Sequence, residues 1–592
     1  MIAVLTAQEP SAKYLVNLQP PLVRHFDLIA QAPGGVALLR ELILTLAVQG
    51  KLVPQDTSDE PAIELLKKIR AEKDRLIADK KLKREKDEPA LMGNALPFDL
   101  PETWAWVALG EVIDIVRGIT FPATQKTREA APGRIACLRT SNVQQYIEWD
   151  DLLFVDRSFM GREDQLIQHH DIVMSMANSR ELVGKVALID QIPHAEATFG
   201  GFLGVLRPRK IDPRYAMVVL RTPYARSLLI DSSSQTTNIA NVSLAKLRPL
   251  PFPLPSEAEQ SRIVTRVDEL MQVCDALEAS GQLEAQQHGQ LVSTLLGTLT
   301  QSETPEVLAE NWQRIATHFD VLLDHPEAVD ALEQTILQLA VRGLLVPQDP
   351  TDEPASVLLQ KIRTEKDHLI AQGKIKRDKP LPPITDEEKP FELPQGWQLT
   401  RLGASIELIS GQHLGPDEYV EGLDGGIPYL TGPAEFGVES PSPTRSTKET
   451  RAVASSGDIL ITVKGSGVGK LNVVRHPEIA ISRQLMAIRP LGVNFDFVLL
   501  VLKTMGLKFQ AQAVGIAIPG IGREDVAGSL VALPPFAEQL RIVTRVNEIR
   551  GLCAGLRQSL ASVQTAQLLI SNVLIGSFNN FLNPTETNGL SN

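Results

Sequence analysis

Three stretches of the chain carry residue types that could do enzymatic chemistry, and each lacks something the chemistry needs. Gly465-Ser-Gly-Val-Gly-Lys470 resembles a phosphate-binding loop, but Leu471 stands where that loop needs Ser or Thr. Asp386-Glu-Glu-Lys389 offers carboxylates like those of a nuclease, but it lies in a linker, where solvated charge is expected. The pair His169-His170 lacks cysteine at metal-ligand spacing. We therefore expect no catalytic centre and no metal site in this chain.

The stronger signal is an internal repeat. The block LPETWAWVALGEV around Trp104 recurs as LPQGWQLTRLGAS around Trp397, and GKLVPQD before Thr57 recurs as GLLVPQD before Pro350. A third block, LPSEAEQSRIVTRV from Leu254, recurs as LPPFAEQLRIVTRV. The blocks keep the same order in both halves, and 592 residues are enough for several domains. The sequence therefore predicts two similar halves related by an internal pseudo-two-fold repeat.

The block that closes each half predicts a long helix. Its apolar residues fall at alternating steps of four and three, which is the a/d spacing of a coiled coil. They are Ile263, Val267, Leu270, Cys274 and Leu277 in the first copy, and Ile542, Val546, Ile549, Cys553 and Leu556 in the second.

Between the repeated blocks, residues 119–250 and 412–531 share short apolar, strand-like runs and one helix, with deletions in the loops. This pattern predicts two α+β domains of mixed sheet. The expected order is an N-terminal helical region (1–95), a first domain (96–255), a central coiled-coil helix (256–300), a connector with the second helical repeat (301–388), a second domain (389–535) and a C-terminal coiled-coil helix (536–580).

The paired domains keep their apolar runs and change their polar loops. Arg and Lys suit guanine edges, Asn and Gln suit adenine edges, and Ser or Thr suit bases or phosphates. One scaffold with two different sets of loops is what reading two different DNA half-sites requires, although ordinary loop divergence after duplication gives the same pattern. The candidate DNA-binding residues are Arg139, Thr140, Asn142, Ser175, Asn178, Ser179, Arg180, Lys185, Gln235, Thr236, Asn238 and Lys246 in the first domain, and Thr431, Thr462, Lys464, Ser466, Lys470, Arg483, Gln484 and Arg523 in the second.

Composition limits the class of protein. The net charge of −12 argues against binding nucleic acid through overall charge, but local basic surfaces remain open because screening limits a charge's reach to about 10 Å. Three cysteines do not suggest a disulfide framework, and the first thirty residues do not read as a signal peptide. With no apolar run of membrane-spanning length expected, we predict a cytoplasmic protein.

The repeated blocks resemble those of the specificity subunits of type I restriction-modification systems, over about 39–300 and 332–580. The resemblance implies two target recognition domains joined by two antiparallel helices, each domain binding half of a split, asymmetric DNA site. It also implies two modification subunits that bring S-adenosylmethionine and methylate adenine, and restriction subunits that use ATP and magnesium. No cofactor is then expected in this chain. From the residues alone, a duplicated helical adaptor whose domains bind proteins stays open as the alternative.

Overall fold

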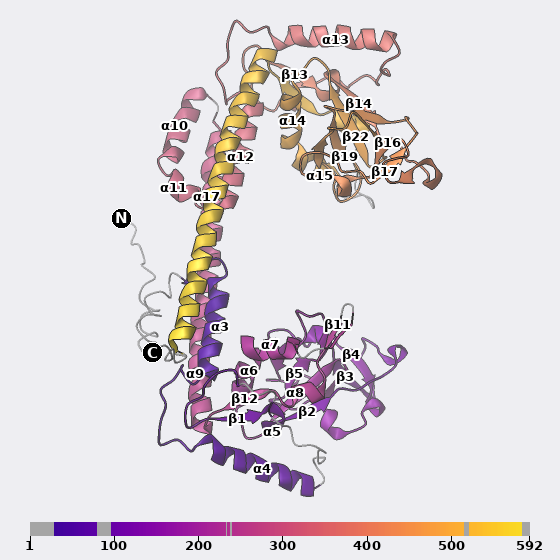
Figure 1. Cartoon of the computed structure of the whole chain (residues 1–592). Helices are drawn as coiled ribbons and strands as arrows, with labels where there is room; N and C mark the ends of the chain where they lie inside the picture. Colours follow the sequence, from indigo (N-terminus) through magenta and orange to yellow (C-terminus); the bar gives the residue numbers. More distant parts are fainter. Residues whose placement is uncertain are drawn as a thin grey trace, which may run out of the picture. The chain divides into compact units, whose positions relative to one another are not determined.

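The computed structural model describes residues 29–79, 91, 96–231, 234–236, 239–302, 304–513 and 520–582. The chain forms two compact units: one contains the residues up to Leu283 together with those from Val563 onward, and the other is Glu284–Ser562 (Figure 1). Each unit contains one α+β domain and parts of two long helices. The predicted fold class and internal repeat are therefore confirmed.

Each domain is built around a four-stranded antiparallel sheet with equivalent strand order. In the first domain the order is β2 (Ile113–Arg117), β9 (Leu203–Pro208), β5 (Ile172–Ser175) and β7 (Val186–Leu188). In the second it is β14 (Ile406–Ser410), β22 (Leu485–Pro490), β19 (Ile459–Thr462) and β20 (Leu471–Val473).

A second sheet in each domain contains one parallel pair. In the first domain its order is β4 (Leu153–Asp156), β3 (Arg134–Leu138) and β8 (Ala197–Phe199), with β3 parallel to β8. In the second its order is β15 (Val420–Glu421), β17 (Arg445–Thr447), β16 (Ile427–Leu430), β21 (Glu478–Ile481) and β18 (Val453–Ser455), with β16 parallel to β21.

The four-stranded sheets are buried on both faces. Side chains alternate between the faces of a strand, so Ile172 and Met174 of β5 join a core shared with the helices, while Val173 joins the core with the second sheet. In the second domain Ile459 and Ile461 join the helical core, and Leu460 joins the core with the second sheet. Burial on both faces explains why these strands read as continuous apolar runs.

The long helices α9 (Glu257–Thr300) and α17 (Phe536–Leu582) each contribute to both units. In the first unit, the start of α9 shares a core with α3 (Gly35–Val48), and Leu574 near the end of α17 packs against that core. In the second unit, the start of α17 shares a core with α12 (Pro326–Val341) and with Leu296 near the end of α9. The pairing of one helix's start with the other's end makes α9 and α17 antiparallel.

The predicted a/d residues do not pack only against the other long helix. Ile263, Val267, Leu270 and Cys274 are buried in the core that contains α3. Ion pairs fix the same contact, because Arg40 of α3 lies 2.6 Å from Asp275 and 2.7 Å from Glu278 of α9. In the second unit α12 takes the place of α3, and its Glu333 pairs with Arg550 and Arg557 of α17 at 2.6 Å. The connector before α12 adds α10 (Pro305–Ala316) and α11 (Phe319–Leu322).

The sequence blocks that open and close each half are each other's contact partners. Trp104 Nε1 donates to Glu259 Oε2 at 2.8 Å, and Trp397 Nε1 donates to Glu538 Oε2 at 3.0 Å. Both carboxyls are 1% exposed, and burial raises the pKa of each. A buried carboxylate needs hydrogen-bond donors, so the tryptophan of one block and the glutamate of the other belong to one structural unit.

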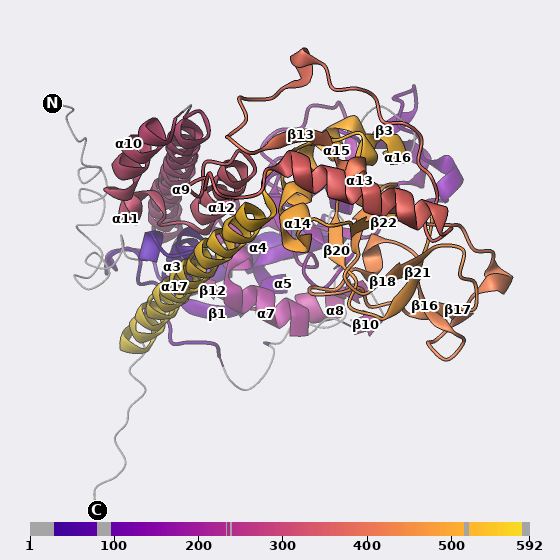
Figure 2. The ribbon, with the colours of Figure 1, turned by 90° about the horizontal axis from the view of Figure 1, so that it is seen from above.

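Two charged helices, α4 (Ala62–Ala78) and α13 (Ala355–Ala371), lie against their domains through equivalent lysines. Lys73 Nζ donates to the carbonyl oxygen of Gly110 at 2.7 Å. Lys366 Nζ donates to those of Gly403 and Ile406 at 2.8 and 3.0 Å. Figure 2 shows α13 lying across the second domain. Part of the charge in these helices is therefore structural.

In each domain two backbone segments lie so close together that one of them needs glycine at the contact. A Cβ atom on Gly118 would lie 2.2 Å from the carbonyl oxygen of Gly200, and one on Gly411 would lie 2.0 Å from that of Ser482. No side chain fits at these distances. The same approach in both domains places the residues after Gly200 and Ser482 at corresponding points of the fold.

The three cysteines are buried and unpaired. Burial raises the pKa of Cys274 to about 11 and that of Cys137 to about 12, and it also raises the pKa of Cys553. A thiol must ionise to act as a nucleophile, so these residues act as small apolar side chains.

Candidate nucleic-acid interface

In the second domain, three of the predicted residues line one open depression of about 380 Å³. Lys464, Arg483 and Gln484 form it together with Gly465 and Gly520. All three side chains are exposed. Within the part of the chain that the structure describes, Lys464 and Arg483 have no ion-pair partner, so their charges are available to a ligand.

Backbone hydrogen bonds bring these loops together. Val463 N donates to the carbonyl oxygen of Gln484 at 2.8 Å, and Ile521 N donates to that of Val463 at 2.9 Å. Lys464 also forms an isolated bridge with Gly520. The residues that follow β19 therefore meet those that precede β22 at one end of the sheet.

The depression has the chemistry of a base-reading surface. Arginine and lysine donate to the acceptors of guanine, and glutamine forms a bidentate pair with adenine. Ser466 and Lys470 are exposed on the same β19–β20 turn, where they suit contacts with phosphate oxygens.

Three other predicted residues of this domain are buried or bound to local partners. Thr462, the last residue of β19, is 0% exposed, which does not fit direct contact with DNA. Thr431 Oγ1 donates to Glu435 Oε2 at 2.7 Å. Arg523 Nη2 lies 2.5 Å from Asp378 Oδ1, and its Nη1 contacts the Ser410 hydroxyl at 3.3 Å. The guanidinium of Arg523 thus fastens the chain after α13 to the domain, and it does not line the depression.

The corresponding end of the first domain has different side chains. Ser175 is paired with Leu203 just as Thr462 is paired with Leu485, so Phe202 occupies the position of Gln484. The amides of Met176 and Ala177 donate to the carbonyl oxygen of Phe202 at 2.9 and 3.3 Å. A small sheet extends this end, in which β6 (Ala177–Asn178) pairs with β11 (Ile239–Asn241) and β11 pairs with β10 (Ser234–Thr236).

Some predicted residues of the first domain make hydrogen bonds or ion pairs within their own loop. Asn142 is 3% exposed, donates to the carbonyl oxygens of Glu148 and Asp150 at 3.0 Å, and accepts from the Arg139 amide. Arg139 lies 2.8 Å from Asp151 Oδ2. Ser175 is 1% exposed. The interior positions of Asn142 and Ser175 do not fit direct DNA contact, whereas Thr140, beside Asn142, is half-buried.

The remaining predicted residues lie at or near the surface. Arg180 is exposed, with no ion-pair partner among the described side chains, and Ser179 and Asn178 beside it are half-buried. Lys185 Nζ donates to Gln144 Oε1 at 2.5 Å. Lys246 is half-buried on α8 (Leu244–Leu247). Gln235 and Thr236 are placed by the backbone of β10, and Asn238 lies outside the described residues.

Sequence reasoning missed Phe202, which is 69% exposed at the predicted interface. DNA contacts were predicted from polar residue types alone, and an aromatic side chain is not among them. A signal was present in the repeat, because Phe202 aligns with Gln484, which was selected. An exposed aromatic residue suits contact with a thymine methyl group or insertion at a base step.

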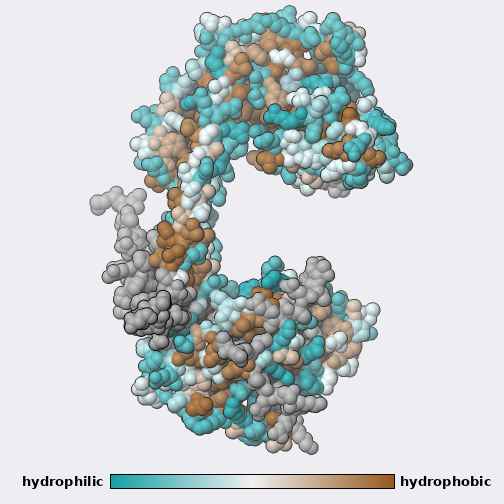
Figure 3. All heavy atoms as spheres, in the orientation of Figure 1, coloured by the Kyte–Doolittle hydropathy of each residue, from teal (hydrophilic) through white to brown (hydrophobic). Residues whose placement is uncertain are grey.

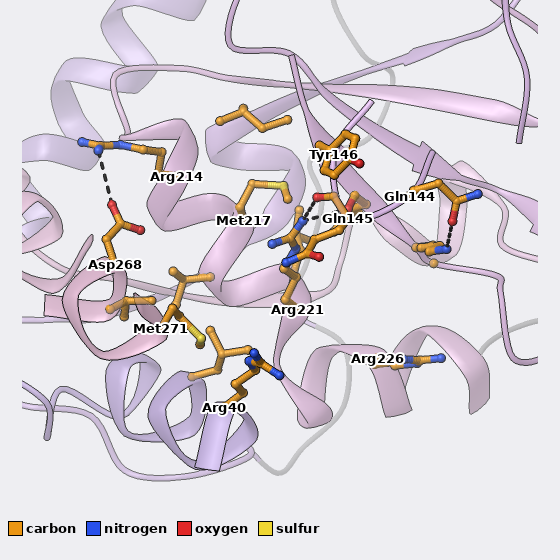
Figure 4. A pocket seen from close by; sticks show the side chains of 18 of the residues that line it. Arg40, Gln144, Gln145, Tyr146, Arg214, Met217, Arg221, Arg226, Asp268 and Met271 are labelled. Atoms are coloured by element: carbon orange, nitrogen blue, oxygen red, sulfur yellow. Dashed lines mark hydrogen bonds and ion pairs between the residues drawn. The ribbon is translucent and has the colours of Figure 1, made fainter. Parts of the chain in front are cut away.

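A cavity of about 640 Å³ lies behind this end of the first domain, between the 144–146 loop, α3, α9 and α6 (Pro213–Arg221) (Figure 4). Arg221 Nη2 donates to the carbonyl oxygen of Gln145 at 2.5 Å, and Arg214 lies 3.6 Å from Asp268. Cations and carboxylates are both present in its lining, so it does not select ligands of one charge. The contact from Arg221 supports the 144–146 loop.

The stretches that resemble catalytic motifs fold differently from such motifs. Strand β20 follows Lys470, where a phosphate loop needs a helix. In the linker, Glu388 pairs with Arg401 at 2.8 Å and Asp386 pairs with Lys389 at 2.6 Å, which makes this acidic run a structural contact.

The chain is similar to several known proteins. The family model described as "Type I restriction modification DNA specificity domain" matches residues 101–286. The type I restriction enzyme EcoEI specificity subunit of Escherichia coli is 33% identical over 566 residues, covering 91% of this chain and 93% of that relative. The EcoAI specificity subunit of the same organism is 41% identical over 384 residues, covering 64% of this chain and 63% of that relative. A chain from a solved structure of a type I R-M system is 20% identical with a TM-score of 0.48, covering 81% of this chain and 98% of that one.

Proposed function

The chain belongs to the family of type I restriction enzyme specificity subunits, and we propose that its two α+β domains each bind one half of a bipartite, asymmetric DNA site. The observation that carries this proposal is the loop-bearing end of each domain. The backbone there is equivalent in the two copies, but Lys464, Arg483 and Gln484 stand where the first domain has Ala177, Gly201 and Phe202. Equivalent scaffolds with different groups facing the base edges would read different sequences.

We also propose that catalysis lies in partner subunits. Two modification subunits would supply S-adenosylmethionine and methylate adenine, and restriction subunits would supply ATP- and magnesium-dependent cleavage. The α17 helix offers a docking surface for the modification subunits, because Val563, Leu569, Ile570 and Val573 are 49–68% exposed on it. Figure 3 shows hydrophobic side chains gathered over this helix.

The same surface explains a membrane-like signal. The segment Phe536–Gly576 of α17 is long and apolar enough to cross a membrane by length and composition, contrary to the prediction that no run of this kind is present. Its Ile542 and Val546 are nevertheless buried in the core of the second unit. We propose a cytoplasmic protein whose exposed α17 residues are covered by protein.

Removing a base-reading cation should weaken specific binding. We expect Lys464→Ala and Arg483→Ala each to lose about 1–3 kcal/mol of binding to the methylated site if the side chain contacts a base. The measurement is titration of the chain, assembled with its modification subunits, on the specific duplex and on a random duplex at several salt concentrations. A phosphate contact would instead weaken both duplexes and lower the salt slope by about one.

Arg475 provides a matched control. It is exposed, and it follows Val473 at the opposite end of the β19–β20 hairpin from Lys464. Arg475→Ala should leave both affinities unchanged. If the Lys464, Arg483 and Arg475 variants bound equally well, this end of the domain would not be part of the DNA site.

An exchange between the copies tests specificity directly. Phe202→Gln places in the first domain the residue that the second domain has at the equivalent position. We expect it to change the preferred base at one position of one half-site by about 1–3 kcal/mol, because glutamine pairs with adenine and phenylalanine contacts the thymine methyl. Sequencing of bound fragments from a randomised pool measures the change, and an unaltered motif would show that Phe202 does not contact DNA.

A further inference from the structure

Two imidazoles and one carboxylate meet in the second unit, away from the DNA-facing loops. His288 lies on α9, and Asp324 and His325 lie between α11 and α12. Asp324 Oδ1 is 3.1 Å from His288 Nε2 and 2.6 Å from His325 Nδ1. One ligand atom from each residue lies within 4.8 Å of the other two.

A backbone oxygen adds to this cluster. The carbonyl oxygen of Val321 lies 3.1 Å from His288 Nε2, so two oxygens converge on the same ring nitrogen. The two imidazole rings have centroids 5.2 Å apart with planes tilted by 43°, so neither ring stacks flat on the other and blocks its nitrogen. His288 is largely shielded, with a side chain that is 17% exposed, whereas Asp324 and His325 are open enough to admit an ion.

The donor set matches a divalent transition metal. Imidazole nitrogen and carboxylate oxygen bind Zn²⁺ at about 2.0–2.2 Å, and tetrahedral ligands are then about 3.3 Å apart. The separations of 2.6 and 3.1 Å around Asp324 Oδ1 need only small side-chain movements to reach that spacing. Nitrogen-rich sites of this kind select Zn²⁺, Co²⁺, Ni²⁺ or Cu²⁺ over Mg²⁺ and Ca²⁺.

We propose that His288, Asp324 and His325 bind one divalent transition-metal ion of the Zn²⁺ class, which fastens the last third of α9 to the α11–α12 connector. Water or the Val321 carbonyl oxygen completes the coordination. The ion has a structural role, because it joins a helix to a segment far from it in sequence. Leu322 and Leu323, directly before Asp324, are buried in the core of the second unit, so the connector already has a fixed position against which α9 can be held.

The internal repeat shows that this cluster is particular to one half. The position of His288 in the first copy of the closing helix corresponds to Gln567 in the second, and His325 corresponds to Ala32 in the first helical repeat. The fold therefore accepts glutamine and alanine at these positions. His288→Gln and His325→Ala are accordingly suitable variants, because they import residues that the chain itself uses.

The test is binding of Zn²⁺ and Co²⁺ to the full chain after treatment with a chelator. Calorimetry should show one equivalent of Zn²⁺, and Co²⁺ should give the visible absorption of a low-coordinate N/O site. A ligand that binds only the folded state raises the unfolding temperature, so zinc should stabilise the wild-type chain. His288→Gln and His325→Ala should each reduce Zn²⁺ affinity by at least about tenfold and abolish the stabilisation.

Two controls separate this site from general binding to surface histidines. His318→Ala, an exposed histidine at the start of α11, should keep one equivalent and the full zinc effect. Without metal, the site variants should unfold at the wild-type temperature, which shows that they fold. Equal Zn²⁺ affinity in wild type, His288→Gln and His318→Ala, or the absence of stoichiometric binding by wild type, would overturn the proposal.

Discussion

Replacing residues 119–250 with the corresponding domain of a relative is expected to change one half of the methylated DNA motif and leave the other half intact. The structure explains why such an exchange should be tolerated. Strand β1 (Ala105–Ala108) pairs with β12 (Pro251–Leu254), and both strands lie outside the exchanged segment. The chain therefore enters and leaves the domain through one ladder that the exchange retains.

The reciprocal exchange, of residues 412–529, is the matched control. It retains the ladder between β13 (Gln398–Arg401) and β23 (Leu530–Leu533) and should change the other half of the motif. The measurement is sequencing of methylated sites in host DNA for each chimaera. Simultaneous change of both halves by either exchange would show that the domains do not specify independently.

The sequence predicted the framework because repetition and apolar periodicity define it. Trp104 and Trp397, most of the a/d residues and the paired apolar runs occupy equivalent buried positions in the two copies. A buried position restricts size and polarity, so its pattern survives duplication. The fold class and the long helices could therefore be predicted from the sequence alone.

The candidate site could be predicted only in part, because residue type does not give side-chain direction. Thr462 was selected for its hydroxyl, but its place as the last residue of β19 turns it into the interior. Arg523 was selected for its charge, but the distant linker supplies Asp378 as its partner. Lys464 and Arg483, in contrast, follow and precede strands at the same end of the sheet. Which loops meet depends on strand register, and one chain does not show its register in its sequence.

The second large effect is expected at a buried aspartate–arginine ion pair that occurs at equivalent positions in the two domains. Asp171 at the start of β5 is bound by Arg207 of β9 at 2.7 Å, and Asp458 before β19 is bound by Arg489 of β22 at 2.7 Å. Each carboxylate also accepts from a backbone amide, of Gln168 or of Ser455, at 2.8 Å. The hydrogen bonds from Arg489 to Asp458 are the largest cause of the raised pKa of Arg489.

The two domains differ in how unfavourable the arginine becomes when its aspartate is removed. The side chain of Arg207 is 11% exposed, whereas that of Arg489 is 34% exposed and has a second partner, Glu407, at 3.1 Å. Breaking a buried pair leaves an uncompensated charge and costs about 3–5 kcal/mol. We therefore expect Asp171→Asn to destabilise its domain by that amount, and Asp458→Asn to cost about 1–3 kcal/mol, because Arg489 keeps Glu407 and water.

Native-state hydrogen exchange can measure the two domains separately, which a single unfolding transition of a two-unit chain cannot do. Amides of β5 and β9 should lose protection in Asp171→Asn, while those of β19 and β22 keep it. The decisive control is Asp171→Asn combined with Arg207→Met, which removes the stranded charge and should recover most of the loss. If the double variant were as unstable as the single one, the cost would lie in the lost hydrogen bonds of Asp171 and not in the unpaired guanidinium. Equal losses in Asp171→Asn and Asp458→Asn would likewise show that exposure of the arginine does not set the cost.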